Sequence, residues 1–271
     1  MTVRPTHCST AWWAAVTVVN VDIRRHLSPR HHGSLRALAM LSRRTDTSTW
    51  CLVGGMMVLV ALAERNYRGL RSSQTKDLDL VVDICSSPSA LADVVHQLES
   101  FGFELAPGGP SGGFARCTFV GIDQQSQIDV LCPNDADTQQ LRSVPHVESL
   151  AIPGGRRAIE GSQLVAIQFS DDQREVVVRV PLGADSLIVK AHAVFDTRTA
   201  HQQRHIQDVV ELLLCLEDPG SENTRLNSTD FSILTHLAER LDDDHDIAWA
   251  EFDASERNRA RAALDLLLAT E

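Results

Sequence analysis

The sequence predicts an α/β (α+β) protein in which a strand-rich core precedes an all-helical C-terminal region. Short apolar runs typical of buried strands alternate with helical segments over about residues 33–182. After Pro181, apolar residues recur at three- and four-residue spacing, which is typical of helices. The hydrophobic fraction, 43% of 271 residues, is that of an ordinary globular protein long enough to bury a substantial core.

Periodicity and turn residues predict the individual elements in order. The core is expected to contain a helix over 34–44, a strand over 50–53 ending at Gly54-Gly55, a helix over 56–65, a strand over 78–84, a helix from Pro88 to Gly102, strands over 115–120 and 127–131, and a strand pair over 164–168 and 175–180. Later helices are expected over 185–197, 200–216, 229–241 and 255–269. Residues 1–32 lack a periodic apolar face, so we expect a disordered, dispensable extension before a core over 33–182 and a helical region over 183–271.

The charge is unevenly spread along the chain. Residues 1–50 hold seven arginines and two aspartates, a charge of +5, so the remainder carries −16 of the net −11. An acidic body does not suit a protein that grips nucleic acid phosphates over a wide surface. It does suit a site that gathers carboxylates around metal ions, although acidity that only keeps the protein soluble is an equally good explanation.

Cysteine usage and hydropathy predict the compartment. The six cysteines form no C-x-x-C pair, so we expect reduced thiols and neither a zinc site nor disulfides. The longest early apolar stretch, 11–19, is shorter than the roughly 20 residues that span a bilayer. It has no cleavage site behind it and runs into Arg24-Arg25, unlike a signal peptide. We expect a soluble, cytoplasmic protein without a membrane partner.

A glycine pair and two aspartates form the most informative stretch. Gly54-Gly55 stands between a strand and a helix, where backbone N–H groups can approach an anion. Asp77 and Asp79 follow Thr75, and strand alternation would put both carboxylates on one face. Two carboxylates that close repel each other unless a cation lies between them, and oxygen ligands favour Mg²⁺ or Mn²⁺ over zinc. Together these parts predict a triphosphate site.

A third carboxylate, Asp129, lies in the apolar strand 127–131. If that strand pairs beside Asp77 and Asp79, the three acids could hold two metal ions for in-line attack of a hydroxyl on an α-phosphate. Each signal is weak alone, because a D-x-D is usually a solvated strand end and a glycine pair is usually a turn. Their order along the chain is far more specific.

In this order of elements the chain resembles the AbiEii/MenT-like branch of the DNA polymerase β-type nucleotidyltransferases, which contains toxins of toxin–antitoxin systems. The resemblance covers about residues 34–216. Downstream segments in the family's order are 154–158, 164–167, 186–191 and 204–213. The resemblance implies a polymerase β-like core with a mixed sheet and a C-terminal helical region.

The resemblance also implies roles for particular residues. Asp77, Asp79 and Asp129 would bind Mg²⁺ or Mn²⁺. Gly54, Gly55 and Thr75 would bind the NTP. Lys190 would contact phosphate or nucleotide, and Asp208 would orient it. An exposed helix lysine would need no explanation, but Lys190 is one of only two lysines and lies in an apolar run. Asp208 could equally be an ordinary helix-surface residue.

Function by resemblance is transfer of an NMP from an NTP to a hydroxyl, with the 3′ end of tRNA as acceptor and a cognate antitoxin as partner. Two departures point to altered specificity or low activity: Ser73 and Gly112-Gly113 stand where relatives often carry basic residues. Two alternatives stay open. One is a transferase that modifies a protein or a small molecule, as the aminoglycoside-modifying enzymes do. The other is an inactive interaction partner on the same fold.

Overall fold

The computed structural model describes residues 17–27, 31–67, 69, 77–106, 117–121, 126–145, 147, 149–170, 175–198 and 202–269. Three features that the sequence singles out lie outside these residues: Thr75, Ser73 and the glycine pair 112–113. The predicted acids and the predicted lysine lie within them: Asp77, Asp79, Asp129, Lys190 and Asp208.

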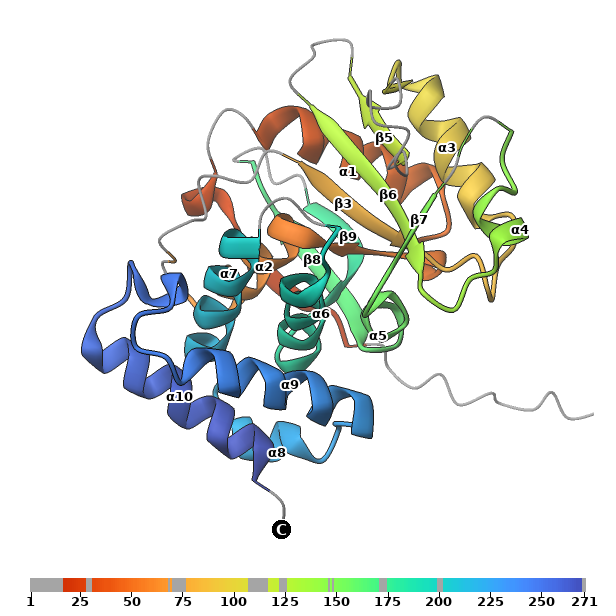
Figure 1. Ribbon diagram of the computed structural model, residues 1–271. Coiled ribbons are helices and arrows are strands. Elements are labelled where there is room, and N and C mark those ends of the chain that lie inside the picture. The colour runs from red at the N-terminus through yellow and green to blue at the C-terminus, as the bar shows by residue number, and fades with distance from the viewer. Residues whose placement is uncertain are drawn as a thin grey trace, which may run out of the picture.

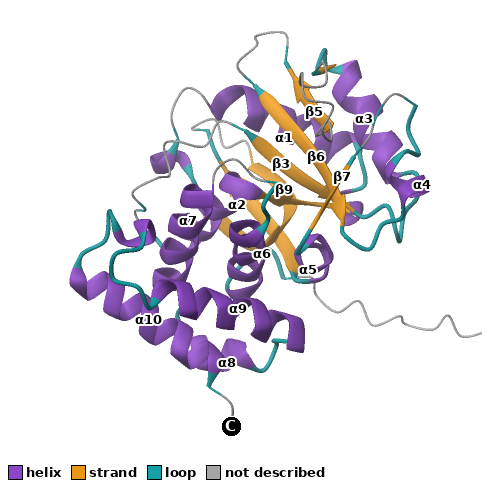
Figure 2. Ribbon diagram, viewed as in Figure 1, coloured by secondary structure: helices purple, strands orange, loops and turns teal. Residues whose placement is uncertain are grey.

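A mixed six-stranded sheet forms the centre of the molecule (Figures 1 and 2). Its strands are β2 (Trp50–Val53), β3 (Leu78–Val82), β6 (Gln127–Pro133), β5 (Cys117–Val120) and β4 (Glu104–Leu105), hydrogen-bonded in that order, with β7 (Leu150–Ile152) also on β6. β6 runs parallel to β3 and β7, and the other pairs are antiparallel. The two central strands β3 and β6 are almost wholly buried, as their apolar runs predict.

A second sheet holds three strands in the order β1 (Val19–Asp22), β8 (Ser162–Gln168) and β9 (Glu175–Pro181). β1 is parallel to β8, with Val19 opposite Val165. The expected disordered extension is therefore wrong for residues 17–27. Val21 and Ile23 are buried, and a short 3-10 turn, η1 (Arg24–His26), follows. Four residues are too few to show a period, so the partner strand β8 decides this element; residues 1–16 are not described.

Helices α1 (His32–Arg44) and α3 (Ala90–Ser100) contact each other and lie behind the strands in Figure 1. Helix α2 (Gly54–Glu64) follows β2 directly and is buried at every position from Met56 to Ala63. It packs against β2 and β3 and against the later helices α6 and α7. A helix that is apolar all round belongs in the interior, and α2 accordingly joins the core to the C-terminal helices.

The C-terminal region is helical, with α6 (Ala184–Phe195) and α7 (Gln202–Cys215) packed on each other and on α2. An outer group follows at the lower left of Figure 1: α8 (Pro219–Asn223), α9 (Ser228–Leu241), η4 (Ile247–Trp249) and α10 (Ala254–Leu268). Asn227 and Asp253 cap α9 and α10 with full capping boxes. One continuous apolar cluster includes both parts of the chain. The predicted fold class, a mixed α/β core with a C-terminal helical region, is confirmed.

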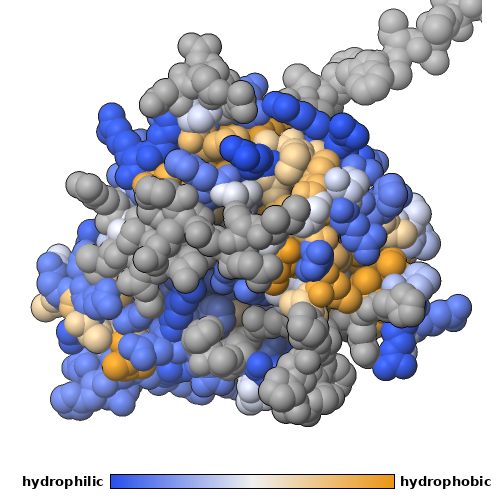
Figure 3. All heavy atoms as spheres, turned by 90° about the horizontal axis from the view of Figure 1, so that it is seen from above, coloured by the Kyte–Doolittle hydropathy of each residue, from blue (hydrophilic) through white to orange (hydrophobic). Residues whose placement is uncertain are grey.

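Several short elements were not expected from the sequence. They are β4, β7, η3 (Thr47–Thr49), α4 (Thr138–Leu141), α5 (Gly155–Glu160) and α8. No helix in the described part of the chain is both long and apolar enough to cross a membrane. Figure 3 shows one face with hydrophilic side chains around its rim and apolar ones gathered towards its middle.

Candidate active site

A row of four residues crosses the six-stranded sheet at the end of β2. Val53 lies opposite Asp79, Asp79 opposite Asp129, and Asp129 opposite Thr118. Residues opposite each other on neighbouring strands project to the same face, so the Asp79 and Asp129 side chains lie next to each other. The parallel register of β3 and β6, strands 45 or more residues apart in sequence, creates this juxtaposition.

Gly54 lies in close contact with the Asp79 side chain of this acid pair. It begins α2 with a positive φ of 66°, and a Cβ placed there would overlap the Asp79 carboxylate. A positive φ is costly for residues other than glycine, so both backbone and space require glycine here. The N-terminus of the buried helix α2 thus lies against Asp79, and that end of a helix favours anions.

Asp129 is buried, with 3% of its surface exposed, and two uncharged side chains donate hydrogen bonds to it. The Thr118 hydroxyl donates a hydrogen bond to Asp129 Oδ1 at 2.6 Å. The Gln127 amide donates to the same oxygen at 3.3 Å. These two bonds orient the carboxylate through one of its two oxygens. Asp79, by contrast, is half-buried.

Lys190 and Asp208 form a second charged pair in the interior. Lys190 Nζ lies 2.8 Å from Asp208 Oδ2, and only 4% and 6% of the two side chains are exposed. The pair joins α6 to α7. A lysine this buried needs a partner, and Asp208 supplies it.

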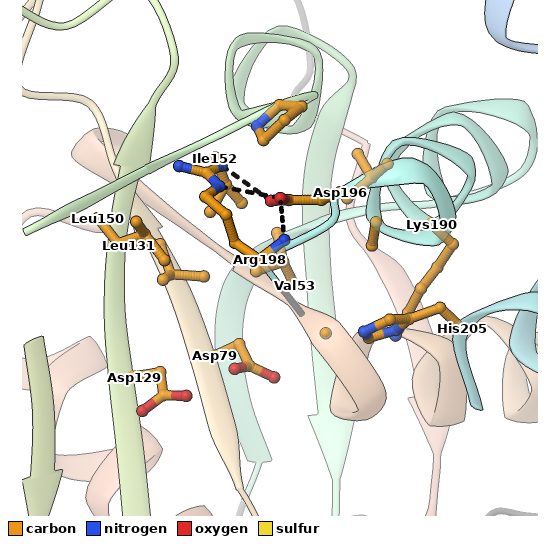
Figure 4. Close-up of a pocket in the computed structure, with 14 residues that line it drawn as sticks. Val53, Asp79, Asp129, Leu131, Leu150, Ile152, Lys190, Asp196, Arg198 and His205 are labelled. Carbon is orange, nitrogen blue, oxygen red and sulfur yellow. Dashed lines mark hydrogen bonds and ion pairs between the residues drawn. The ribbon is translucent and has the colours of Figure 1, made fainter. Parts of the chain in front are cut away.

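These residues meet in one pocket (Figure 4). Gly54, Asp79, Asp129 and Lys190 line it together with residues that the sequence analysis did not select. The additional lining residues are Val53, Leu131, Leu150, Ile152, Pro153, Val189, Ala193, Asp196, Arg198 and His205. One wall, from β6, β7 and α6, is therefore apolar, whereas the acids, Lys190 and the Asp196–Arg198 pair are polar points on it. Pockets that bind small molecules combine walls and points of this kind.

Asp196 and Arg198 form the main polar feature that the sequence analysis missed. Asp196 accepts hydrogen bonds from the backbone N–H, Nε and Nη2 of Arg198, at 3.0, 2.9 and 2.8 Å. A sequence signal for this arrangement exists, because the same D-x-R spacing occurs at Asp22 and Arg24 with the same three bonds. The D-x-R spacing predicts these three local hydrogen bonds, which we call the clamp, but it does not predict that the clamp lines a pocket.

The other predicted site residues are placed differently. Asp77 is half-buried and lies directly before the first residue of β3, two residues from Asp79. Gly55 lies in the first turn of α2 and is not among the lining residues. Asp208 acts behind Lys190 and does not line the pocket. Thr75 lies outside the described residues.

The donor set fits a divalent cation in part. Asp79 and Asp129 offer carboxylate oxygens, the ligands that Mg²⁺ and Mn²⁺ prefer. Among the described residues, however, no group of three or more His, Cys, Asp or Glu side chains is arranged to hold a metal ion. The expected convergence of three acids is thus a pair here.

Four cysteines of the described region, Cys51, Cys85, Cys132 and Cys215, are free thiols, and burial raises the pKa of each of them.

Comparison with known proteins adds little to this geometry. No protein-family model matches the chain, and no curated protein matches it. Among solved structures, the chain is distantly similar to the structure of a STING-associated CdnE c-di-GMP synthase from Capnocytophaga granulosa. The identity is 8%, the TM-score is 0.25, and the match covers 88% of this chain and 78% of that chain. A TM-score this low supports no statement about residues or reaction.

Proposed function

We propose that this protein is a metal-dependent nucleotidyltransferase that moves an NMP from an NTP to a hydroxyl acceptor. The observation that supports it best is the register of β3 with β6, which sets Asp79 beside Asp129 at the start of α2. Adjacent like charges repel each other unless a cation lies between them, and Lys190 lines the same pocket. Two carboxylates, a helix N-terminus and a lysine are the groups that a metal-bound triphosphate requires.

Asp79 and Asp129 would hold Mg²⁺ or Mn²⁺, and Asp77, the next acid along the chain, is the candidate third ligand. A cation bound there would polarise the acceptor hydroxyl and neutralise charge on the departing pyrophosphate. Thr118 and Gln127 donate hydrogen bonds to Asp129 Oδ1 and so help to fix the orientation of this carboxylate. Because the pair must be held in a fixed geometry, these two neutral side chains act as positioning residues.

The phosphates would lie between the acid pair and the C-terminal helices. Gly54 and Gly55 would present backbone N–H groups at the N-terminus of α2, and Thr75 would assist from its segment before β3. Lys190 would contact a phosphate oxygen through Nζ. Asp208 would hold Lys190 in place, because its carboxylate is 2.8 Å from Nζ in a buried setting. Little covalent work is then asked of the protein beyond position and charge.

The acceptor we propose first is the 3′ end of tRNA, in a toxin-like protein with a cognate antitoxin, as the family resemblance implies. A protein or small-molecule acceptor is the second candidate, and one observation favours it. Both cations of the described pocket lining, Lys190 and Arg198, are paired with carboxylates, so this part of the pocket offers little attraction to an RNA backbone.

The test is to incubate the protein with each α-labelled NTP, Mg²⁺ or Mn²⁺, and total cellular RNA and protein, and then to separate RNA, protein and small molecules. Label in the RNA fraction supports the tRNA proposal, and label in either other fraction supports the second candidate. Absence of label from all fractions with all four NTPs would contradict the proposed activity.

A further inference from the structure

The Asp196–Arg198 pair stands at the end of the pocket away from the acid pair. In Figure 4 the Arg198 guanidinium and Ile152 lie at one end of the pocket, whereas Asp79 and Asp129 lie at the opposite end, with Leu131 and Leu150 along the wall between. If the triphosphate occupies the acid end, as the proposed function requires, this end receives the nucleoside.

Arg198 is held rigidly and keeps donors free for a ligand. Its Nε and Nη2 bind the two Asp196 oxygens side-on, at 2.9 and 2.8 Å. Within the described part of the chain, no hydrogen bond is made by Nη1. The guanidinium therefore still presents a planar fork, made of Nη1 and the second Nη2 hydrogen. Arg198 is 42% exposed at its side chain, so a ligand can reach this fork.

The chemistry of the fork favours a base over a phosphate. The Asp196 carboxylate, only 8% exposed, already balances the charge of Arg198. The neighbouring side chains of Leu150, Ile152 and Pro153 are apolar, which suits the face of an aromatic ring better than a phosphate group. A neutralised, rigid pair of donors next to an apolar wall is suited to hydrogen bonding the edge of a base.

We infer, on the basis of the proposed function, that Arg198 is the residue that selects the base of the NTP, with Asp196 as its positioning residue. Two parallel donors match a base edge with two adjacent acceptors. Guanine offers O6 and N7, and cytosine offers O2 and N3. In adenine and uracil each acceptor of the edge lies beside a donor, which faces one arm of the fork. The site therefore prefers GTP or CTP to ATP and UTP.

The test is calorimetric titration of the four NTPs and of inorganic tripolyphosphate, with Mg²⁺, into the full-length protein and two variants. Arg198→Lys keeps the charge but removes the fork. Arg24→Lys is the matched control, because Arg24 clamps Asp22 through the same three bonds and is not a lining residue of the described pocket. Melting temperatures of both variants check that clamp removal leaves the fold intact.

We expect the parent protein and Arg24→Lys to bind GTP or CTP roughly tenfold or more tightly than ATP and UTP, the value of one bidentate pair. Arg198→Lys should bind the four NTPs about equally, with its tripolyphosphate affinity unchanged. If Arg198→Lys retains the preference, or loses tripolyphosphate affinity as much as NTP affinity, Arg198 does not read the base. NTPs that bind the parent without preference overturn this inference alone. A parent that binds no NTP overturns the proposed function and this inference with it.

Discussion

Two buried carboxylate regions of this protein balance their charge in different ways. Asp185, in the first turn of α6, is 2% exposed at its side chain and has arginine partners on two sides. Arg157 Nη2 lies 2.8 Å away and Arg225 Nη2 lies 2.7 Å away. Asp129, almost as buried, lies opposite a second carboxylate, Asp79, in the adjacent strand.

We interpret this difference as that between a structural site and the proposed functional site. The Asp185 cluster links α5, α6 and the segment between α8 and α9 through fixed ion pairs, so its charges serve the fold. At Asp129, the uncharged Thr118 and Gln127 donate hydrogen bonds to one carboxylate oxygen, Oδ1. Removing an acid should therefore cost stability in the first region and activity in the second.

The largest effect is expected for Asp79→Asn. Nucleotidyl transfer should fall by about a thousandfold or more, because an amide is a poor ligand for magnesium. Metal-free stability should hold or rise by about 1 kcal/mol, because the change relieves repulsion with Asp129. The measurements are a transfer assay and a urea titration without metal. A sharp loss of metal-free stability would make Asp79 a structural group.

The opposite result is expected for Asp185→Ala. The substitution leaves Arg157, only 17% exposed at its side chain, without its nearest partner. We expect a loss of about 3–4 kcal/mol in the free energy of unfolding. Urea denaturation measures it, with the exposed Asp265→Ala of α10 as control. NTP affinity of the folded protein should not change; a loss of affinity without a loss of stability would erase the distinction between the two regions.

The Lys190–Asp208 pair shares a property with each region. Like the Asp185 cluster it is a buried ion pair, and like the acid pair it has a member, Lys190, that lines the pocket. Lys190→Met or Asp208→Leu alone should cost about 3 kcal/mol, because each leaves a buried charge unpaired. The double variant should regain most of that stability but no transfer activity. A double variant that stays active would assign the pair to the fold alone. A double-mutant cycle of unfolding free energies and rates separates the two roles.

The smallest effect is expected for β1, which belongs to the three-stranded sheet. Val21→Ala should destabilise the protein by about 2 kcal/mol, because Val21 is 3% exposed where β1 pairs with β8. The measurement is again urea denaturation, with the exposed Val18→Ala as control. Equal stability of parent and variant would return this segment to the dispensable extension that the sequence suggested.

The sequence predicts those parts of the site whose position depends on residues close together in the chain. The apolar runs locate β2, β3 and β6, and the glycine pair locates the start of α2. The pairing of Asp79 with Asp129 depends on strand register, which no local pattern contains. Strand alternation groups Asp77 with Asp79, but β3 begins one residue after Asp77, at Leu78. Arg198 joins the pocket only because α6 and α7 pack on each other and on α2, a tertiary arrangement.

The proposed function requires Asp79 and Asp129 together to hold a metal-bound NTP. The most direct measurement is calorimetric titration of a non-hydrolysable NTP, with and without Mg²⁺, into the parent protein, Asp129→Asn and the exposed α3 control Asp93→Asn. We expect Mg²⁺-dependent binding to the parent and to Asp93→Asn, and a loss of at least tenfold in affinity in Asp129→Asn. Equal, Mg²⁺-dependent binding by Asp129→Asn, or binding by the parent that ignores Mg²⁺, would contradict it.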